Sequence, residues 1–154
     1  MKQIDTGSYI SALRQLVQEG HEVSVPIAGN SMMPFLIDRR DAAWLRAPQR
    51  PLKVGDIVFY QRSNGAFILH RICQLTPDGF YAVGDGQQLI EGPLARSQVF
   101  AVVTAVRRKG KRIGPGHFWW EFFRLIWIRM IPLRHRILKL YGIPFAPTGG
   151  KSNE

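Results

Sequence analysis

The residues of this chain that could perform chemistry together are one serine, one histidine and two acids. Ser31 lies in the stretch GNSMMPFL, where the flanking glycine and proline predict a turn that presents its side chain. A serine hydroxyl is a poor nucleophile until a base takes its proton, and the neutral imidazole of His70 suits that role. Asp85 or Glu91 could orient the imidazole and offset its charge. The set suits acyl transfer, although residue types alone indicate it only weakly.

Short β-rich segments must position these four residues. Between about residues 23 and 108, runs such as GDIVFYQR, GAFILHRICQL and SQVFAVVTAVRR are separated by Gly, Pro, Asn and Asp turns. RSNGA predicts a hairpin, because Asn-Gly tolerates the positive φ of such turns. Apolar residues recur at helical spacing from Tyr9 to Glu19. We therefore expect a mainly β protein, with a short N-terminal helix in residues 1–22 and a β-domain over residues 23–108.

The last third of the chain carries almost all of the net charge. Residues 1–104 hold ten Lys/Arg and nine Asp/Glu, whereas residues 105–154 hold eleven and two. We expect a basic linker at 109–116, aromatic amphipathic helices at 117–143 that Pro132 bends or interrupts, and a disordered tail at 144–154. Charged residues make the helices poor membrane spans. The basic residues of this segment are Arg124, Arg129, Arg134, Arg136 and Lys139.

Two interpretations of residues 117–143 remain open. A basic helix rich in Trp and Phe suits an anionic membrane surface. The same aromatic side chains could instead pack on the β-domain. The charge alone would also suit nucleic acid, but no nucleic-acid-binding motif accompanies it, so we expect no such partner.

Four local motifs follow one another in a specific order. They are G-x-S-M-x-P at Ser31, G-D-I-V at Asp56, H-R-I at His70 and G-D at Asp85. This order resembles the signal peptidase I superfamily over roughly residues 24–107. It is similar in particular to the endoplasmic reticulum, archaeal and some Gram-positive signal peptidases, where a histidine replaces the usual lysine base. Self-cleaving SOS-repressor domains are more distant relatives. We interpret Asp56 as a structural turn residue.

The resemblance implies the signal peptidase and repressor-cleavage type of β-fold, and it assigns roles. Ser31 would be the nucleophile and His70 the general base. Asp85 and Glu91 would be the family's two acidic positions. The second acid of the family is normally aspartate, so Glu91 departs from the pattern and Asp85 is the better candidate to contact His70. The Ser31 N–H, helped by Asn30, would form the oxyanion hole. Three neighbours would fix the turn and line the substrate groove: Met32, Met33 and Pro34.

The resemblance thus implies a serine endopeptidase that cleaves an extended segment of a protein or peptide precursor, without a cofactor. Family members cleave after small residues in a peptide that pairs with a strand edge. The alternative is a catalytically silent or self-cleaving, repressor-like regulatory module. Only one helix is expected before the β-domain, which is too little for a helix-turn-helix.

The remaining reactive side chains suggest no second site. Cys73 lies on an apolar strand and is interpreted as structural. His21, His117 and His135 show no metal-ligand spacing, so we expect no metal. Signal peptidases carry transmembrane helices, whereas the N-terminal sequence here predicts neither a signal peptide nor an anchor. We expect a cytoplasmic protein, either free or peripheral at the inner face of the membrane.

Overall fold

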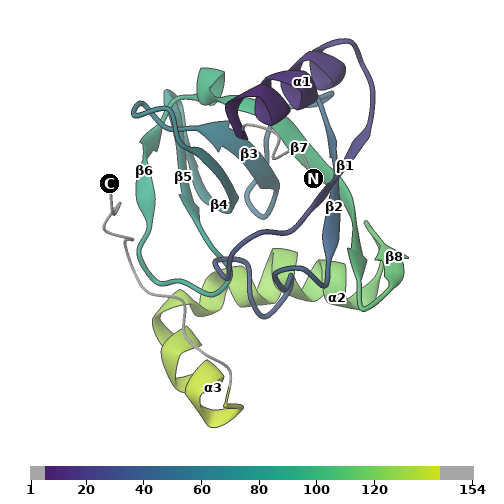
Figure 1. Cartoon of the computed structure of the whole chain (residues 1–154). Coiled ribbons are helices and arrows are strands. Elements are labelled where there is room, and N and C mark those ends of the chain that lie inside the picture. The colour runs from purple at the N-terminus through teal and green to yellow at the C-terminus, as the bar shows by residue number, and fades with distance from the viewer. Residues whose placement is uncertain (1–5, 143–154) are drawn as a thin grey trace.

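The computed structural model describes residues 6–142 (Figure 1). Within that range, eight strands form one antiparallel sheet in the order β1-β2-β7-β3-β4-β5-β6, with β8 paired to β7. This confirms the mainly β class. The strands are β1 (Val23–Pro26), β2 (Ala42–Arg46), β3 (Ile57–Gln61), β4 (Phe67–Thr76), β5 (Gly79–Val83), β6 (Glu91–Leu94), β7 (Val99–Arg108) and β8 (Lys111–Ile113).

The predicted N-terminal helix is present before the sheet. The helix α1 spans Thr6–Gln18 and buries Ile10, Leu13 and Val17, which recur every three or four residues along one face. Gly20, with a φ of 93°, ends it in the left-handed conformation that glycine adopts without strain. Figure 1 shows α1 lying above one end of the curved sheet.

Short helical turns follow the sheet. They are α2 (Phe118–Glu121), a π-helical turn η2 (Phe122–Ile126), a 3-10 segment η3 (Trp127–Leu133) and α3 (Arg134–Leu140). A further 3-10 turn, η1 (Arg96–Gln98), precedes β7. Met130 leaves the helical region just before Pro132, whose ring and missing N–H disfavour a continuous helix. None of the helices within residues 6–142 is long and apolar enough to cross a membrane.

Apolar side chains cover both faces of the sheet. Neighbouring residues of a strand point to opposite faces, so Ile57 joins the larger cluster and Val58 the smaller one. The larger cluster joins α1 to β1, β2, β7 and the C-terminal helical segment. The smaller one consists of Val58, Tyr60, Ile72, Phe80, Ala82 and Leu94.

The segment after β7 is integrated into the domain. Residues 109–116 were predicted as a linker, but they form the turn after β7 and the strand β8. Lys109 and Gly110 adopt φ values of 53° and 81°, which turns the chain back on itself. In the helical segment, Phe123, Trp127 and Leu138 are buried in the larger cluster. The interpretation that the aromatic side chains of this segment pack on the β-domain is therefore confirmed for the face that carries Phe123 and Trp127. The predicted tail at 144–154 lies outside the described residues.

Candidate active site

Ser31 and His70 line the same groove, which has a volume of about 730 Å³. Ser31 lies in the turn after β1 and is partly exposed, whereas His70 lies on β4 and is 6% exposed. The walls come from α1, from residues 25–29 and from the β3–β4 hairpin. The fold thus brings the predicted nucleophile and base, which are far apart in the sequence, to one cavity. Its apolar lining includes Tyr9, Ile10, Leu13, Val25, Ile27, Met32, Phe59, Phe67 and Leu69.

The serine turn rests on a second turn, formed by residues 84–86. The Gly86 N–H donates to the Ser31 carbonyl at 2.9 Å. A Cβ atom on Gly84 would lie 2.4 Å from that same carbonyl oxygen, and one on Gly86 would lie 2.7 Å from the carbonyl oxygen of Met33. Side chains at either position would therefore push the two turns apart. The two glycines around Asp85 fix the location of Ser31, a role that was not predicted from the sequence.

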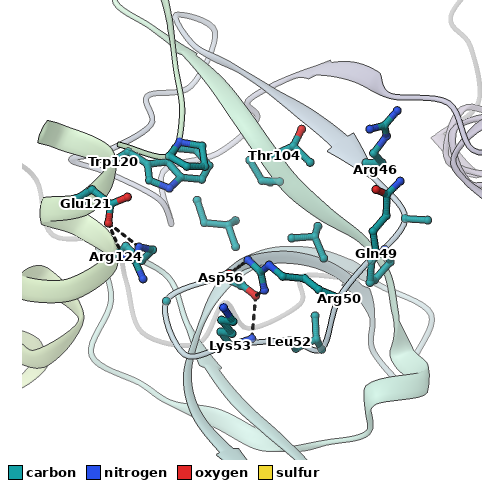
Figure 2. Close-up of a pocket in the computed structure, with 17 residues that line it drawn as sticks. Arg46, Gln49, Arg50, Leu52, Lys53, Asp56, Thr104, Trp120, Glu121 and Arg124 are labelled. Carbon is teal, nitrogen blue, oxygen red and sulfur yellow. Dashed lines mark hydrogen bonds and ion pairs between the residues drawn. The ribbon is translucent and has the colours of Figure 1, made fainter. Parts of the chain in front are cut away.

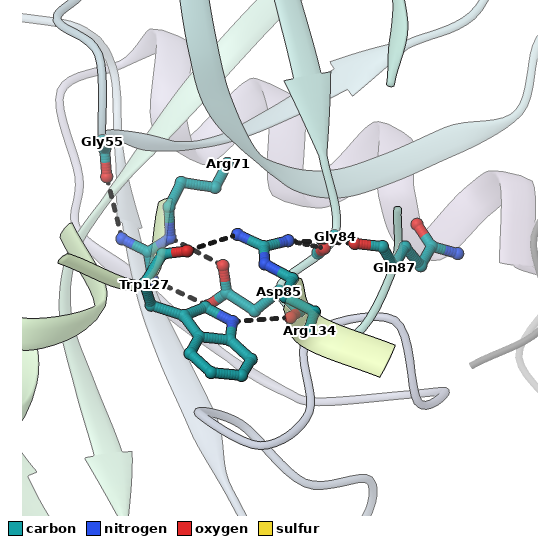
Figure 3. A network of polar contacts seen from close by, with 7 residues as sticks. All are labelled: Gly55, Arg71, Gly84, Asp85, Gln87, Trp127 and Arg134. Atoms are coloured by element: carbon teal, nitrogen blue, oxygen red, sulfur yellow. Dashed lines mark hydrogen bonds and ion pairs between the residues drawn. The ribbon is translucent and has the colours of Figure 1, made fainter. Parts of the chain in front are cut away.

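Asp85 is bound to Arg71 and not to His70 (Figure 3). The Arg71 Nε and Nη2 atoms donate to the two carboxylate oxygens at 2.8 Å each, and Nη1 donates to the Gly55 carbonyl at 2.8 Å. Arg71 follows His70 on β4, so its side chain points to the opposite face of the sheet. The structure therefore corrects the expectation that Asp85 contacts the base. Its charge acts on the imidazole only at longer range.

Glu91, the second predicted acid, is linked to His70 through Tyr60. The Tyr60 hydroxyl donates to Glu91 Oε2 at 3.0 Å and lies 3.5 Å from His70 Nδ1. Arg62 holds the same carboxylate with two hydrogen bonds, of 2.8 and 2.7 Å. Neither Tyr60 nor Arg62 was predicted from the sequence to belong to the site.

Strand register explains why Glu91, and not Asp85, faces the histidine. Tyr60 pairs with the residue two positions before His70 on β4, so the two side chains are diagonal neighbours on one face. Ile72, on that same face, pairs with Ala82, and Ala82 pairs with Glu91. Paired residues share a face, so the register carries Glu91 to the side of the sheet that His70 occupies.

The electrostatics favour a neutral imidazole beside an ionised acid. Burial is the main cause of a His70 pKa lowered to about 4; the Arg62 charge also lowers the pKa, while Glu91 and Asp85 oppose the shift. Burial would raise the pKa of Glu91, but hydrogen bonds from Arg62 and Tyr60 outweigh it and the pKa is lowered. Burial and the nearby Glu91 charge raise the pKa of Tyr60. Near neutral pH, His70 is therefore free of charge and able to accept a proton.

The predicted neighbours of Ser31 divide between groove and core. Met32 lines the groove, as expected. Met33 is buried and the Pro34 carbonyl accepts a hydrogen bond from Arg108 at 3.4 Å, and neither residue is among those described as lining the groove. That expectation is corrected for both. Asn30 is exposed, and its carbonyl accepts the Met33 N–H at 3.2 Å, which closes the turn.

The C-terminal segment holds the turn at Asp85 in place (Figure 3). The Trp127 indole N–H donates to the Asp85 carbonyl at 2.7 Å. Arg134 donates to the carbonyls of Gly84 and Gln87 at 2.9 and 3.0 Å, and also to that of Trp127 at 3.2 Å. Arg134 is 0% exposed. It therefore cannot contact a membrane surface, although from the sequence it was counted among the basic residues that could do so. A cation in a basic stretch gives no sequence signal of such burial.

A second cavity, of about 490 Å³, lies beside α2 (Figure 2). Its two acids are both occupied, because Asp56 binds Arg50 in a bidentate pair at 2.9 Å and Glu121 binds Arg124. Asp56 also accepts the Lys53 N–H at 2.8 Å, which agrees with its structural interpretation. No serine, histidine or cysteine is among the described residues of its lining. The groove at Ser31 is therefore the better candidate site.

Cys73 and the metal-ligating residue types are the candidates for a second site in the described part of the chain. Burial raises the pKa of the Cys73 thiol, which contacts the Tyr81 carbonyl at 3.5 Å, so its thiolate is disfavoured. Within residues 6–142, no three His, Cys, Asp or Glu side chains are grouped so that they could hold a metal ion. No protein-family model, curated protein or solved structure matches this chain.

Proposed function

We propose that the chain is a serine endopeptidase of the signal peptidase I type, with the β-fold of that superfamily. The observation that carries this proposal is the shared groove of Ser31 and a buried, neutral His70. Ser31 attacks the scissile carbonyl while His70 takes its proton, and His70 then protonates the leaving amine. Water hydrolyses the acyl-Ser31 ester with His70 again as the base. The backbone N–H of Ser31, with the exposed Asn30 beside it, stabilises the oxyanion.

The substrate is an extended segment of a protein or peptide precursor. Strand β1 is an outer strand of the described sheet, and its residues Val25 and Pro26 border the groove. On the opposite wall, residues 67–69 of β4 precede Arg71, where the described pairing with β5 begins. Both stretches offer backbone groups along the groove, and an extended peptide can use these groups by adding a strand.

Covalent labelling of Ser31 tests the proposal. The full chain is incubated with a peptidyl fluorophosphonate, and the adduct is measured by intact mass and located by peptide mapping. We expect one adduct, on Ser31, that is absent in Ser31→Ala and strongly slowed in His70→Ala. Ser63→Ala is the matched control, because Ser63 is an exposed serine in the β3–β4 turn. Absence of labelling in the wild type, or equal labelling of Ser31→Ala, would contradict the proposal.

The alternative function, a silent or self-cleaving regulatory module, gives a different result. Self-cleavage during prolonged incubation without substrate yields two fragments whose masses add up to the chain plus one water. A chain that stays intact and also fails to react with the fluorophosphonate is a silent module. An intact chain that labels at Ser31 supports an endopeptidase that acts on another molecule.

We also propose that the outer side of residues 118–141 contacts an anionic membrane. Large apolar side chains are exposed there, including Phe118 at 68% and Leu140 at 81%. Arg129, Arg136 and Lys139 are exposed on the same segment. Aromatic and aliphatic side chains beside cations suit a lipid headgroup region of negative charge.

Vesicle co-sedimentation tests this contact with the full chain. We expect binding to vesicles that contain phosphatidylglycerol, weak binding to phosphatidylcholine alone, and loss of binding in a Phe118→Ser, Leu140→Ser double variant. Leu89→Ser is the control, since Leu89 is equally apolar and 58% exposed but lies outside the segment. Binding of the double variant at the wild-type level would refute the contact.

A further inference from the structure

Tyr60 lies between His70 and Glu91, and proton transfer from Ser31 to His70 does not by itself explain its presence there. We infer that Tyr60 is a positioning residue, which links Glu91 to His70 and fixes the imidazole in the tautomer that carries its hydrogen on Nδ1. In this tautomer Nε2 holds the lone pair that accepts the Ser31 proton. The inference rests on the proposed function for its catalytic meaning, but the tautomer can be measured independently of activity.

The Tyr60 hydroxyl has a single proton to donate. That proton is directed to Glu91 Oε2 at 3.0 Å, because an ionised carboxylate can only accept hydrogen bonds. Arg62 keeps Glu91 ionised through two charge-assisted hydrogen bonds. The phenol oxygen therefore presents a lone pair, and not a proton, to His70 Nδ1 at 3.5 Å. A hydrogen bond between these two atoms needs the hydrogen on Nδ1.

The surroundings of Tyr60 favour one fixed position for its hydroxyl. The residue is 0% exposed, and its ring packs edge-on against Phe80 at 5.8 Å and against His70 at 6.4 Å between centroids. Three charged groups act on His70: Glu91 and Arg62 on the phenol side, and Asp85, which is bound to Arg71. Glu91 is thus the acid connected to the imidazole by hydrogen-bonding groups, and the connection passes through the phenol.

Tyr60→Phe is the informative variant, because it removes one oxygen atom and keeps the ring. Glu91 retains both hydrogen bonds from Arg62, so no buried carboxylate loses its cation. Tyr60 is not among the described residues of the groove lining, so binding of a peptide there is unaffected. We expect a fall of about tenfold in the rate constant of Ser31 acylation, the size of one hydrogen bond, with unchanged affinity for the fluorophosphonate.

The decisive measurement is the tautomer of His70 in the uniformly 15N-labelled full chain. Long-range 1H–15N correlation distinguishes a protonated ring nitrogen from one that carries a lone pair. The sequence holds four histidines, and a His70→Gln variant identifies the signals of His70. We expect a protonated Nδ1 and an unprotonated Nε2 near pH 7 in the wild type, and a mixture of tautomers in Tyr60→Phe. Tyr81→Phe is the control and keeps the wild-type signals.

Two results would overturn the inference. One is a wild-type His70 that is protonated at Nε2, and the other is a Tyr60→Phe variant with an unchanged Nδ1-protonated ring and an unchanged acylation rate. These results are separate from the test of the proposed function. Labelling of Ser31 together with the wrong tautomer removes the role of Tyr60 alone. The expected tautomer without any labelling removes the peptidase and retains only the hydrogen-bonded chain.

Discussion

Replacing Asp85 with asparagine separates structural support from catalysis. The change leaves the Arg71 guanidinium, 3% exposed at its side chain, without its anionic partner. Breaking a buried pair in this way costs about 3–5 kcal/mol. Arg71 keeps its hydrogen bond to the Gly55 carbonyl and its place over the Phe35 ring, 5.4 Å from the centroid. We therefore expect the lower end, a loss of about 3 kcal/mol in the free energy of unfolding.

Urea denaturation followed by tryptophan fluorescence measures this loss. With a slope of about 1–3 kcal/mol per molar urea, the midpoint should fall by about 1–3 M. Asp78→Asn is the control, since Asp78 is an exposed acid in the β4–β5 turn and should change stability by less than about 0.5 kcal/mol. Glu91→Gln should show the opposite balance to Asp85→Asn: a clear fall in the rate of Ser31 acylation with a smaller fall in the urea midpoint. The reasoning fails if Asp85→Asn abolishes acylation while its midpoint stays at the wild-type value.

Two further predictions concern the base and the serine turn. Because the pKa of His70 falls from 6.5 to about 4 on folding, the unfolded chain takes up this proton first as the pH decreases. The free energy of unfolding should therefore drop between pH 6.5 and 4 by up to about 3 kcal/mol from this group, and His70→Gln should remove that part of the slope in urea titrations. Gly84→Ala places a Cβ atom 2.4 Å from the Ser31 carbonyl oxygen and should cost about 1–3 kcal/mol and slow acylation. Gly114→Ala, whose nearest contact is 3.5 Å, should match the wild type in both measurements.

The sequence predicted the mainly β class and a pairing of Ser31 with His70, which line one groove, but it did not show which acid lies on the side of His70. Two acids six residues apart look equivalent in a linear pattern. The choice depends on strand register, because His70 and Arg71 are consecutive and face opposite sides of the sheet. Arg71 takes Asp85, while His70 shares its face with Tyr60 and Glu91.

The C-terminal segment shows a second limit of the sequence pattern. Aromatic and basic residues predicted amphipathic helices, and they do form short helical turns. However, the pattern could not show which arginine is buried, since Arg134 and Arg136 lie two residues apart in the same basic and apolar stretch. Tertiary contacts decide the matter: Arg134 reaches three backbone carbonyls and is fully buried, whereas Arg136 is exposed.

The bonds from Trp127 and Arg134 to the turn at residues 84–87 have a consequence for biosynthesis. The ribosome synthesises Ser31 and His70 before it makes Trp127 and Arg134, the residues that fasten this turn. The turn that supports Ser31 therefore reaches its final shape only when almost all of the described chain has emerged. A nascent chain halted near residue 116 would carry Ser31 and His70 but would still lack the two side chains that fasten this turn, so the proposed active site would not yet be assembled.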